Sequence, residues 1–228
     1  MMRRNIILTL SIAFFLIACT LSFADIHTAK SITSDEALTK LKEGNKRYMK
    51  FKFEKKNWKA RMAEVYAGQH PYAVVVCCSD SRVTPEYIFD AGLGEIFVIR
   101  TAGNVLDPIA MGSIEYAAAH CGSPLLVVMG HEKCGAVTAA CEHALEHGSI
   151  PAIVEAIQPA VRAVEKPGVS KPGLIELAVE ENAYRMAKKA YEESSILHKL
   201  VKGGKLKIVV AKYFLKDGHV EFYDKKIH

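Results

Sequence analysis

The sequence has little net charge, no repeats, and no long apolar run after its first residues. The formal charge of +5 falls to +3 from Asp25 onward once Arg3 and Arg4 are set aside, which is too small an excess to indicate a nucleic-acid-binding protein. No apolar stretch beyond the first is long enough to span a bilayer. Half of the 228 residues are hydrophobic, so the composition suits one sizeable globular domain.

The one long apolar run lies at the start of the chain, from Ile6 to Ala18, behind two arginines. Such a basic start and apolar core, followed by small residues, are typical of a secretory signal. Ser22-Phe23-Ala24 resembles a signal-peptidase site, which predicts removal of residues 1–24 and a single domain over 25–228. Leu16-Ile17-Ala18-Cys19 instead resembles a lipoprotein box that would leave Cys19 lipidated, and an uncleaved anchor is the third alternative. We favour soluble release into the periplasm, because the apolar character continues past Cys19 and no flexible Gly/Ser tether follows.

The cysteines are too few and too poorly spaced to form a disulfide framework. Removal of the first 24 residues leaves five, an odd number. Cys77 and Cys78 are adjacent in an extended segment and point to opposite faces. Cys134 and Cys141 lie two turns apart if their segment is helical, about 10 Å, which is beyond disulfide reach. Metal ligation is a better account of Cys78 and Cys134, and burial as small core residues is expected for Cys77, Cys121 and Cys141.

Four short, continuous apolar runs predict strands that are buried on both faces. Helical patterns separate them, so the strands should be joined by crossovers into a mostly parallel sheet with helices on both faces. A last alternating segment, "HVEFYD" (219–224), follows a turn and should pair antiparallel at the edge. The fold class is therefore α/β, with four parallel strands at "YAVVVCC" (72–78), "EIFVIRT" (95–101), "PLLVVMGH" (124–131) and "KLKIVVAKY" (205–213).

Helices are expected where apolar residues recur at helical spacing. The first carries a capping-box pattern, Thr33 with Glu36, at its start. A Pro/Gly-rich stretch at 165–173 is expected to be a surface loop. The predicted helical segments are 33–51, 56–68, 107–122, 136–148 and 174–204.

Polar and metal-ligating side chains leave the carboxyl ends of the first and third predicted strands. Cys78, Asp80 and Arg82 follow the first, and His131 and Cys134 follow the third. In open parallel sheets ligands bind outside the carboxyl ends of the strands, so we expect these side chains to converge if the two strands are neighbours. Two thiolates, an imidazole and a carboxylate make a plausible tetrahedral zinc set.

The role of Asp80 depends on its neighbour Arg82. The carboxylate could bind the metal and close the site, or it could pair with the guanidinium fork of Arg82 and leave the fourth position to water. Zinc lowers the pKa of bound water from 15.7 to about 7. The open form would thus hold a zinc-bound hydroxide ready to attack a small electrophile.

Two stretches, "CCSDSRVTPEYIFDAGLGEIFVIRTAGN" and "GHEKCGAV", closely resemble the signatures of β-class carbonic anhydrases, here in an exported bacterial form. The resemblance runs from about Ser34 to "LKDGHVEF". It implies a zinc lyase that reversibly hydrates carbon dioxide to bicarbonate and a proton. By the same resemblance Cys78, His131 and Cys134 hold Zn²⁺, and Asp80 and Arg82 form the dyad that opens the fourth position.

A finer resemblance, to the plant-type subgroup, concerns the substrate pocket. Gln69, Phe97 and Tyr116 match residues that in that subgroup reach across from the partner subunit, which implies a homodimer at least. Gly135 falls in the same pocket by the resemblance. His120 matches a position proposed to relay protons, although a lone helix histidine is more often simply exposed.

Two departures and two alternatives stay open. Thr101 and Phe214 stand where the family usually has Asn and Asp, which leaves the fine structure of the pocket wall or interface in doubt but not the metal set. Related folds hydrolyse carbon disulfide or carbonyl sulfide through a narrowed access route. A non-catalytic zinc-binding protein is the other alternative, although a closed structural site would not need Asp80 and Arg82.

Overall fold

The computed structural model describes residues 32–145, 147–223 and 227. The predicted signal over 1–24 and its Cys19 lie outside the described residues. The described residues from Ile32 onward form one compact unit. Among them no helix combines the length and the apolar character needed to cross a membrane.

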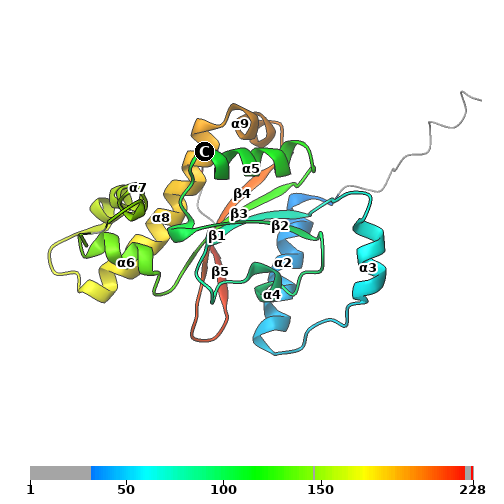
Figure 1. Ribbon diagram of the computed structural model, residues 1–228, viewed down its shortest axis with the longest axis horizontal. Coiled ribbons are helices and arrows are strands. Elements are labelled where there is room, and N and C mark those ends of the chain that lie inside the picture. Colours follow the sequence, from blue (N-terminus) through cyan, green and yellow to red (C-terminus); the bar gives the residue numbers. More distant parts are fainter. Residues whose placement is uncertain (1–31, 146, 224–226, 228) are drawn as a thin grey trace, which may run out of the picture. The chain divides into compact units, whose positions relative to one another are not determined.

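A five-stranded sheet forms the centre of this unit, as Figure 1 shows. Its order is β2-β1-β3-β4-β5; the first four are parallel, and β5 runs antiparallel to β4. The predicted α/β sheet of four parallel strands with an antiparallel edge strand is therefore confirmed. The strands are β1 (Ala73–Cys78), β2 (Ile96–Thr101), β3 (Leu125–His131), β4 (Lys207–Tyr213) and β5 (Val220–Tyr223).

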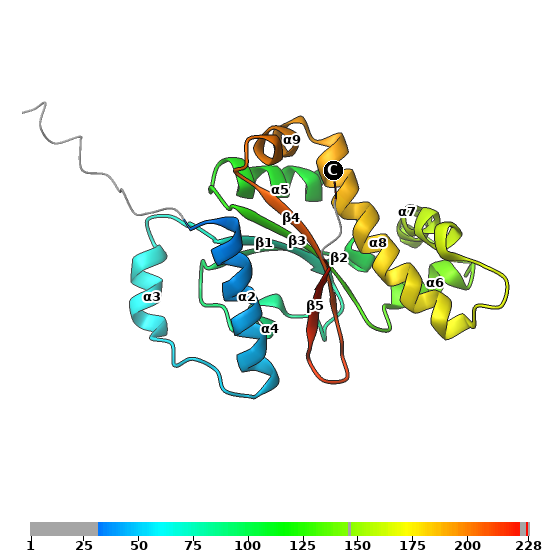
Figure 2. The same ribbon diagram turned by 180° about the vertical axis from the view of Figure 1, so that it is seen from behind.

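Helices cover both faces of the sheet (Figures 1 and 2). Alternate residues of a strand point to opposite faces, so Val74 and Val76 of β1 pack among α5, α8 and α9, while Val75 and Cys77 pack among α2 and α4. The helical elements are α2 (Ser34–Met49), α3 (Trp58–Val65), α4 (Pro85–Ile88), η1 (Ala102–Asn104), α5 (Pro108–Ala119), α6 (Gly135–Cys141), α7 (Ile150–Val164), α8 (Lys171–Glu193) and α9 (Ser195–Lys202).

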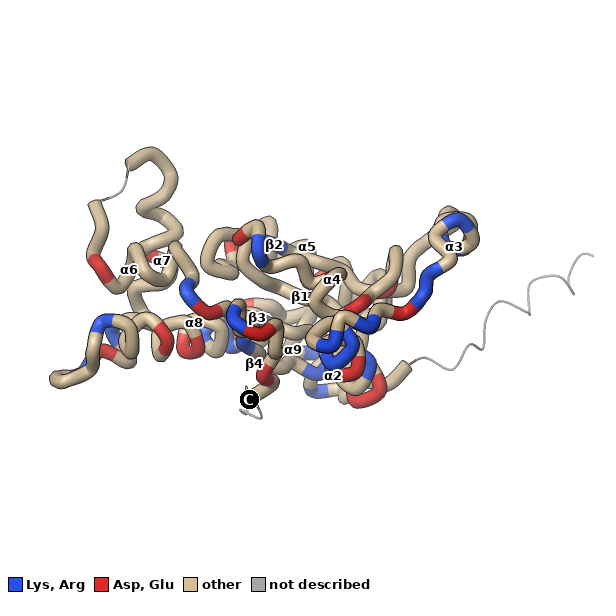
Figure 3. The backbone as a smooth tube through the Cα atoms, turned by 90° about the horizontal axis from the view of Figure 1, so that it is seen from below, with Lys and Arg blue, Asp and Glu red and all other residues tan. Residues whose placement is uncertain are grey.

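The capping box at the start of α2 is confirmed, since Thr33 Oγ1 accepts from the Glu36 amide at 3.2 Å and Glu36 Oε2 accepts from the Thr33 amide at 2.8 Å. Charges of both signs lie along α2 and α8 (Figure 3). On α8, Arg185 pairs with Glu181 one turn away at 2.8 Å. Such pairs are typical of the solvent-facing side of a helix and add little stability individually.

Two predicted helices were wrong in extent and one helix was missed, and the loop expected over 165–173 is shorter than predicted because α8 already begins at Lys171. The helix expected over 136–148 ends at Cys141, because His143 two residues later has a φ of +50°, which a helix does not accommodate. The helix expected over 174–204 breaks at Ser194, whose backbone is extended and whose hydroxyl accepts from the Leu197 amide at 3.1 Å. The helix α7 was not predicted, although its apolar residues recur on one face and bury Ile157 and Val161.

The five cysteines among the described residues are free thiols. Cys77 and Cys141 are buried, as predicted, but Cys121 is half-exposed just beyond the end of α5, so it is not a core residue. A residue that follows the last turn of a surface helix keeps one side toward solvent, which the residue type alone does not reveal.

Candidate metal centre

The structure brings the three predicted ligands together. β1 and β3 are hydrogen-bonded neighbours, with Cys77 opposite Met129, so both strands end at the same edge of the sheet. Beyond that edge α6, α7 and α8 gather (Figure 1). The ligand atoms of Cys78, His131 and Cys134 all lie within 4.8 Å of one another, and all three residues are buried.

The turn after β3 places Cys134. Lys133 adopts a φ of +53°, which reverses the chain after the strand, and Cys134 then becomes the N-cap of α6. Its sulfur lies 3.9 Å from that of Cys78. A helix N-terminus favours negative charge, so the start of α6 would help to hold Cys134 as a thiolate when a bound cation offsets the charge of Cys78.

Hydrogen bonds make Cys78 the thiolate of the pair. Its sulfur accepts from the Cys134 thiol and from the backbone amides of Asp80 at 3.4 Å and Gly103 at 3.3 Å. Donation by Cys134, with further help from these amides, lowers the pKa of Cys78 well below its usual value. The pKa of Cys134 is raised, because its proton is shared with Cys78 and because burial disfavours a second thiolate.

His131 presents a buried nitrogen that no group of the described residues satisfies. Its Nδ1 lies 2.9 Å from the carbonyl oxygen of Glu132, so that nitrogen carries the proton and donates it to the carbonyl. The Nε2 lone pair has no hydrogen-bond partner among the described residues, although the side chain is buried. An unpaired buried acceptor is costly, and a metal ion beside the two sulfurs would satisfy it. Two cysteines and a histidine with a carbonyl fixing its tautomer fit Zn²⁺.

Asp80 faces this cluster but is held by Arg82. Its carboxylate accepts from the Arg82 amide and Nε, each at 2.9 Å, and from Nη2 at 2.7 Å. The Arg82 hydrogen bond is the main cause that lowers the pKa of Asp80, so the carboxyl is ionised. Oδ2 also lies 4.0 Å from Nε2 of His131. The arrangement is the one in which the carboxylate pairs with the guanidinium.

Arg100 holds the backbone next to Cys78 and Asp80, and it was not predicted from the sequence. It lies in β2 opposite Cys77, and its Nη2 donates to the backbone carbonyl of Asp80 at 2.7 Å. Its Nε is 3.4 Å from the carbonyl of Cys78. The signal that could have identified it is its position, a basic residue near the carboxyl end of the strand that pairs with β1.

The predicted pocket residues Gln69, Phe97 and Tyr116 lie far from the cysteine and histidine cluster of the same chain. Phe97 and Tyr116 contact each other with ring centroids 6.3 Å apart, and Tyr116 stacks on His120 at 5.4 Å. Phe97 pairs with Val74, four residues before Cys78, which is about 13 Å along the strand. Gln69 is exposed in the loop before β1, also toward the amino ends of the strands.

Gly135 is the exception among them. It follows Cys134 directly and begins α6, and a Cβ built on it meets no atom within 4 Å. No other side chain of the described residues therefore packs against this position beside the cluster.

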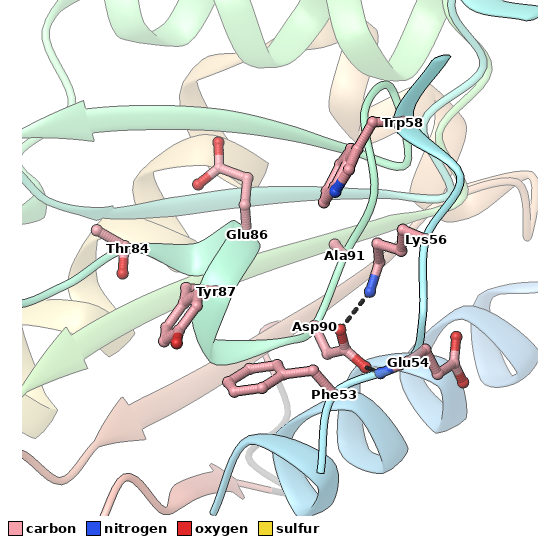
Figure 4. A pocket seen from close by; sticks show the side chains of 9 residues that line it. All are labelled: Phe53, Glu54, Lys56, Trp58, Thr84, Glu86, Tyr87, Asp90 and Ala91. Carbon is pink, nitrogen blue, oxygen red and sulfur yellow. Dashed lines mark hydrogen bonds and ion pairs between the residues drawn. The ribbon is translucent and has the colours of Figure 1, made fainter. Parts of the chain in front are cut away.

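A cavity of about 320 Å³ lies elsewhere, between α4 and the segment that leads into α3 (Figure 4). Asp90 is buried at its base, bound to Lys56 and to Nε of Arg47, the latter at 2.7 Å. None of the three candidate metal ligands lines this cavity. Its lining residues are Phe53, Glu54, Lys56, Trp58, Thr84, Glu86, Tyr87, Asp90 and Ala91.

Comparisons with known proteins agree with this geometry. A family model described as carbonic anhydrase matches residues 73–220. Carbonic anhydrase 2 of Mycobacterium tuberculosis (strain ATCC 25618 / H37Rv) is 38% identical over 190 residues, which cover 81% of this chain and 90% of that protein.

Solved structures show the same fold. The Coccomyxa β-carbonic anhydrase in complex with acetazolamide superposes with a TM-score of 0.65 at 25% identity, covering 72% of this chain and 76% of that one. The β-carbonic anhydrase CcaA superposes with a TM-score of 0.64 at 27% identity, covering 82% and 95%. Sequence, fold and the cysteine and histidine cluster agree, and the chain belongs to the β class of the carbonic anhydrase family.

Proposed function

We propose that this protein catalyses the reversible hydration of carbon dioxide to bicarbonate and a proton, with Zn²⁺ held by Cys78, His131 and Cys134. The observation that carries the proposal is the cluster itself, in which two buried sulfurs and an unpaired imidazole nitrogen lie within 4.8 Å in a chain of this family. Bound by three such ligands, zinc lowers the pKa of a coordinated water to about 7 and so supplies hydroxide at neutral pH.

Asp80 and Arg82 are proposed to keep the fourth metal position open. With Arg82 bound along one edge, the ionised Asp80 carboxylate retains lone pairs that can accept a hydrogen bond from a group near His131. Asp80 would thereby fix the orientation of that group and keep the group's proton directed at the carboxylate and away from the substrate. Without Arg82, the same carboxylate would be free to turn onto the metal and close the site.

We further propose that the substrate pocket is completed by a partner subunit in at least a homodimer. Gly135 would contribute from the same chain as the metal, and Gln69, Phe97 and Tyr116 from the other. The separation of about 13 Å between Phe97 and Cys78 along the strand supports this, because side chains at the amino ends cannot reach the cluster of their own chain. His120, which stacks on Tyr116, would then lie near the pocket as a proton relay.

Two inactive variants should restore each other if the pocket is shared. Cys78→Ala removes the metal, and the double variant Phe97→Ala, Tyr116→Ala removes the pocket wall, so each alone is expected to be nearly inactive. When they are co-expressed, about half of the dimers are mixed and each mixed dimer has one complete site. The expected hydration rate is about a quarter of wild type. A co-expressed mixture as inactive as its components would contradict a shared pocket.

Export is also part of the proposal, with residues 1–24 removed and the protein released into the periplasm. A mature protein that begins at Asp25 would support it. Diacylglycerol on Cys19 would instead show the lipid-anchored form.

The proposed function is tested on the chain from Asp25 onward by metal analysis and stopped-flow measurement of hydration. We expect one zinc per chain, and hydration that a strong chelator abolishes and added zinc restores. Sulfide release from carbon disulfide, measured in parallel, should be negligible. A protein that binds no zinc, or that releases sulfide faster than it hydrates carbon dioxide, would overturn the proposal.

A further inference from the structure

We infer that Asn182 is a positioning residue for the metal centre, acting on the Cys78 sulfur through the backbone of Gly103. The inference rests on the proposed zinc site. Asn182 lies in α8 and is fully buried, and its Nδ2 donates to the Gly103 carbonyl at 2.8 Å. The amide of the same glycine donates to the Cys78 sulfur at 3.3 Å.

Asn182 is the polar exception in a buried helix face. Its neighbours on that face include Val179, Ala183 and Met186, which are all buried and apolar. Burying an amide costs free energy unless it is hydrogen-bonded, and its donor is directed out of α8 to a loop 79 residues earlier in the chain. If Asn182 only filled space on this face of α8, leucine would serve equally well.

Gly103 needs an external restraint. Its φ of +63° and ψ of +22° lie in the left-handed region, and a Cβ there would come within 2.6 Å of Ile157 Cδ1. Glycine is therefore required, but glycine also has access to many other backbone conformations. The hydrogen bond from Asn182 holds the peptide on one side of Gly103, and this keeps the amide on the other side directed at Cys78.

The helix α8 is fixed independently of Asn182. Gly130 of β3 packs so closely that a Cβ on it would lie 2.9 Å from Val179 Cγ1. The buried Lys212 of β4 pairs with Glu176 at 2.7 Å and Glu180 at 3.1 Å. Removal of the Asn182 amide should therefore leave α8 in place and release only the loop at Gly103.

Releasing that loop should weaken the metal centre. An amide that donates to a thiolate stabilises its negative charge and fixes its direction. Outer-shell partners of metal ligands are typically worth 10- to 100-fold in metal affinity. We therefore expect the zinc affinity to fall by about 10- to 100-fold when Asn182 loses its donor.

Asn45 offers a matched control on the opposite face of the sheet. It is equally buried, its Nδ2 donates to the Gly218 carbonyl at 2.8 Å, and its Oδ1 accepts from the Val220 amide at 2.9 Å. These bonds tie α2 to the turn between β4 and β5 and involve none of the proposed ligands. Asn45→Ala should therefore lower thermal stability without changing the metal centre.

The experiment compares wild type with Asn182→Ala, Asn45→Ala and Asn182→Leu, the last of which keeps the branching and heavy-atom number of the side chain but has no donor. Zinc affinity is measured by competition with a chromogenic chelator, and thermal unfolding is measured on the metal-free proteins. Cobalt is then substituted, and the sulfur-to-cobalt charge-transfer band is recorded. With one donor to Cys78 lost, the band of both Asn182 variants should move to longer wavelength, and that of Asn45→Ala should not.

Four outcomes are distinguishable. Weaker zinc binding and a shifted band in the Asn182 variants alone would support the inference. Unchanged affinity and band in folded Asn182→Leu would overturn it, as would equal losses in the Asn182 and Asn45 variants. A wild-type protein that binds no zinc would instead overturn the proposed function itself.

Discussion

His131→Ala is expected to lose zinc and to slow carbon dioxide hydration by about 10⁴-fold or more. The metal is proposed to supply several kcal/mol of stabilisation to the charge that develops in the transition state, and each 1.36 kcal/mol is tenfold in rate. No neighbouring group can replace the ring, because His131 is buried and its Nε2 is the ring nitrogen that remains available once Nδ1 binds the Glu132 carbonyl. Zinc content and stopped-flow hydration are measured on the same sample.

His198→Ala is the control for this prediction. His198 is exposed on α9 and stacks on Tyr191 with a centroid distance of 4.6 Å, on the face of the sheet covered by α5 and α8. Its removal should leave both zinc content and rate unchanged. Retention of zinc and of most of the rate by His131→Ala would refute the ligand set.

Arg82→Ala is expected to slow hydration by about 100- to 1,000-fold while leaving zinc bound. Interactions that orient groups at the reacting centre are typically worth this much. The variant leaves Asp80 without the guanidinium that binds both of its oxygens, so the carboxylate can occupy the fourth metal position. Arg82→Lys keeps the charge but not the planar fork, and it should recover only part of the rate.

The same variant has an expected pH signature in stability. Arg82 lowers the folded-state pKa of Asp80 below the unfolded value of about 3.9. The pair therefore contributes stability above about pH 4, and that contribution is lost as the pH falls through the depressed folded-state pKa. Wild type and Arg82→Ala should differ in thermal midpoint at pH 7 and converge in acid. Full activity of Arg82→Ala with zinc bound would contradict the proposed role of Asp80 and Arg82 in keeping the fourth metal position open.

The strands and the candidate metal ligands were predictable because each has a local signal. A buried parallel strand is a short, continuous apolar run. The runs that became β1, β3 and β4 are too short and too rich in β-branched residues to predict helices. Cysteine, histidine and aspartate at the ends of two such runs limit the chemistry to very few metals. The resemblance to β-class carbonic anhydrases then identified the reaction.

The helix ends were less predictable because they depend on single backbone angles. The residue types around His143 do not distinguish an interrupted helix from a continuous one, and Ser194, a favoured N-cap residue, was the one signal of the second break. The omission of α7 has a similar cause. Pro159 lies inside it and Pro151 at its start, and proline is ordinarily evidence against a helix interior.

The sequence by itself determined the kinds of group at the centre, the strands that carry them and the family. Only the tertiary structure decided how those groups are held. The His131 tautomer depends on a carbonyl at 2.9 Å, and the direction of the Cys78 sulfur depends on an amide 25 residues later. That amide is in turn restrained by Asn182, a further 79 residues along the chain. Hydrogen bonds require both partners within about 3 Å, and such proximity between distant residues arises only when the sheet and its helices have packed.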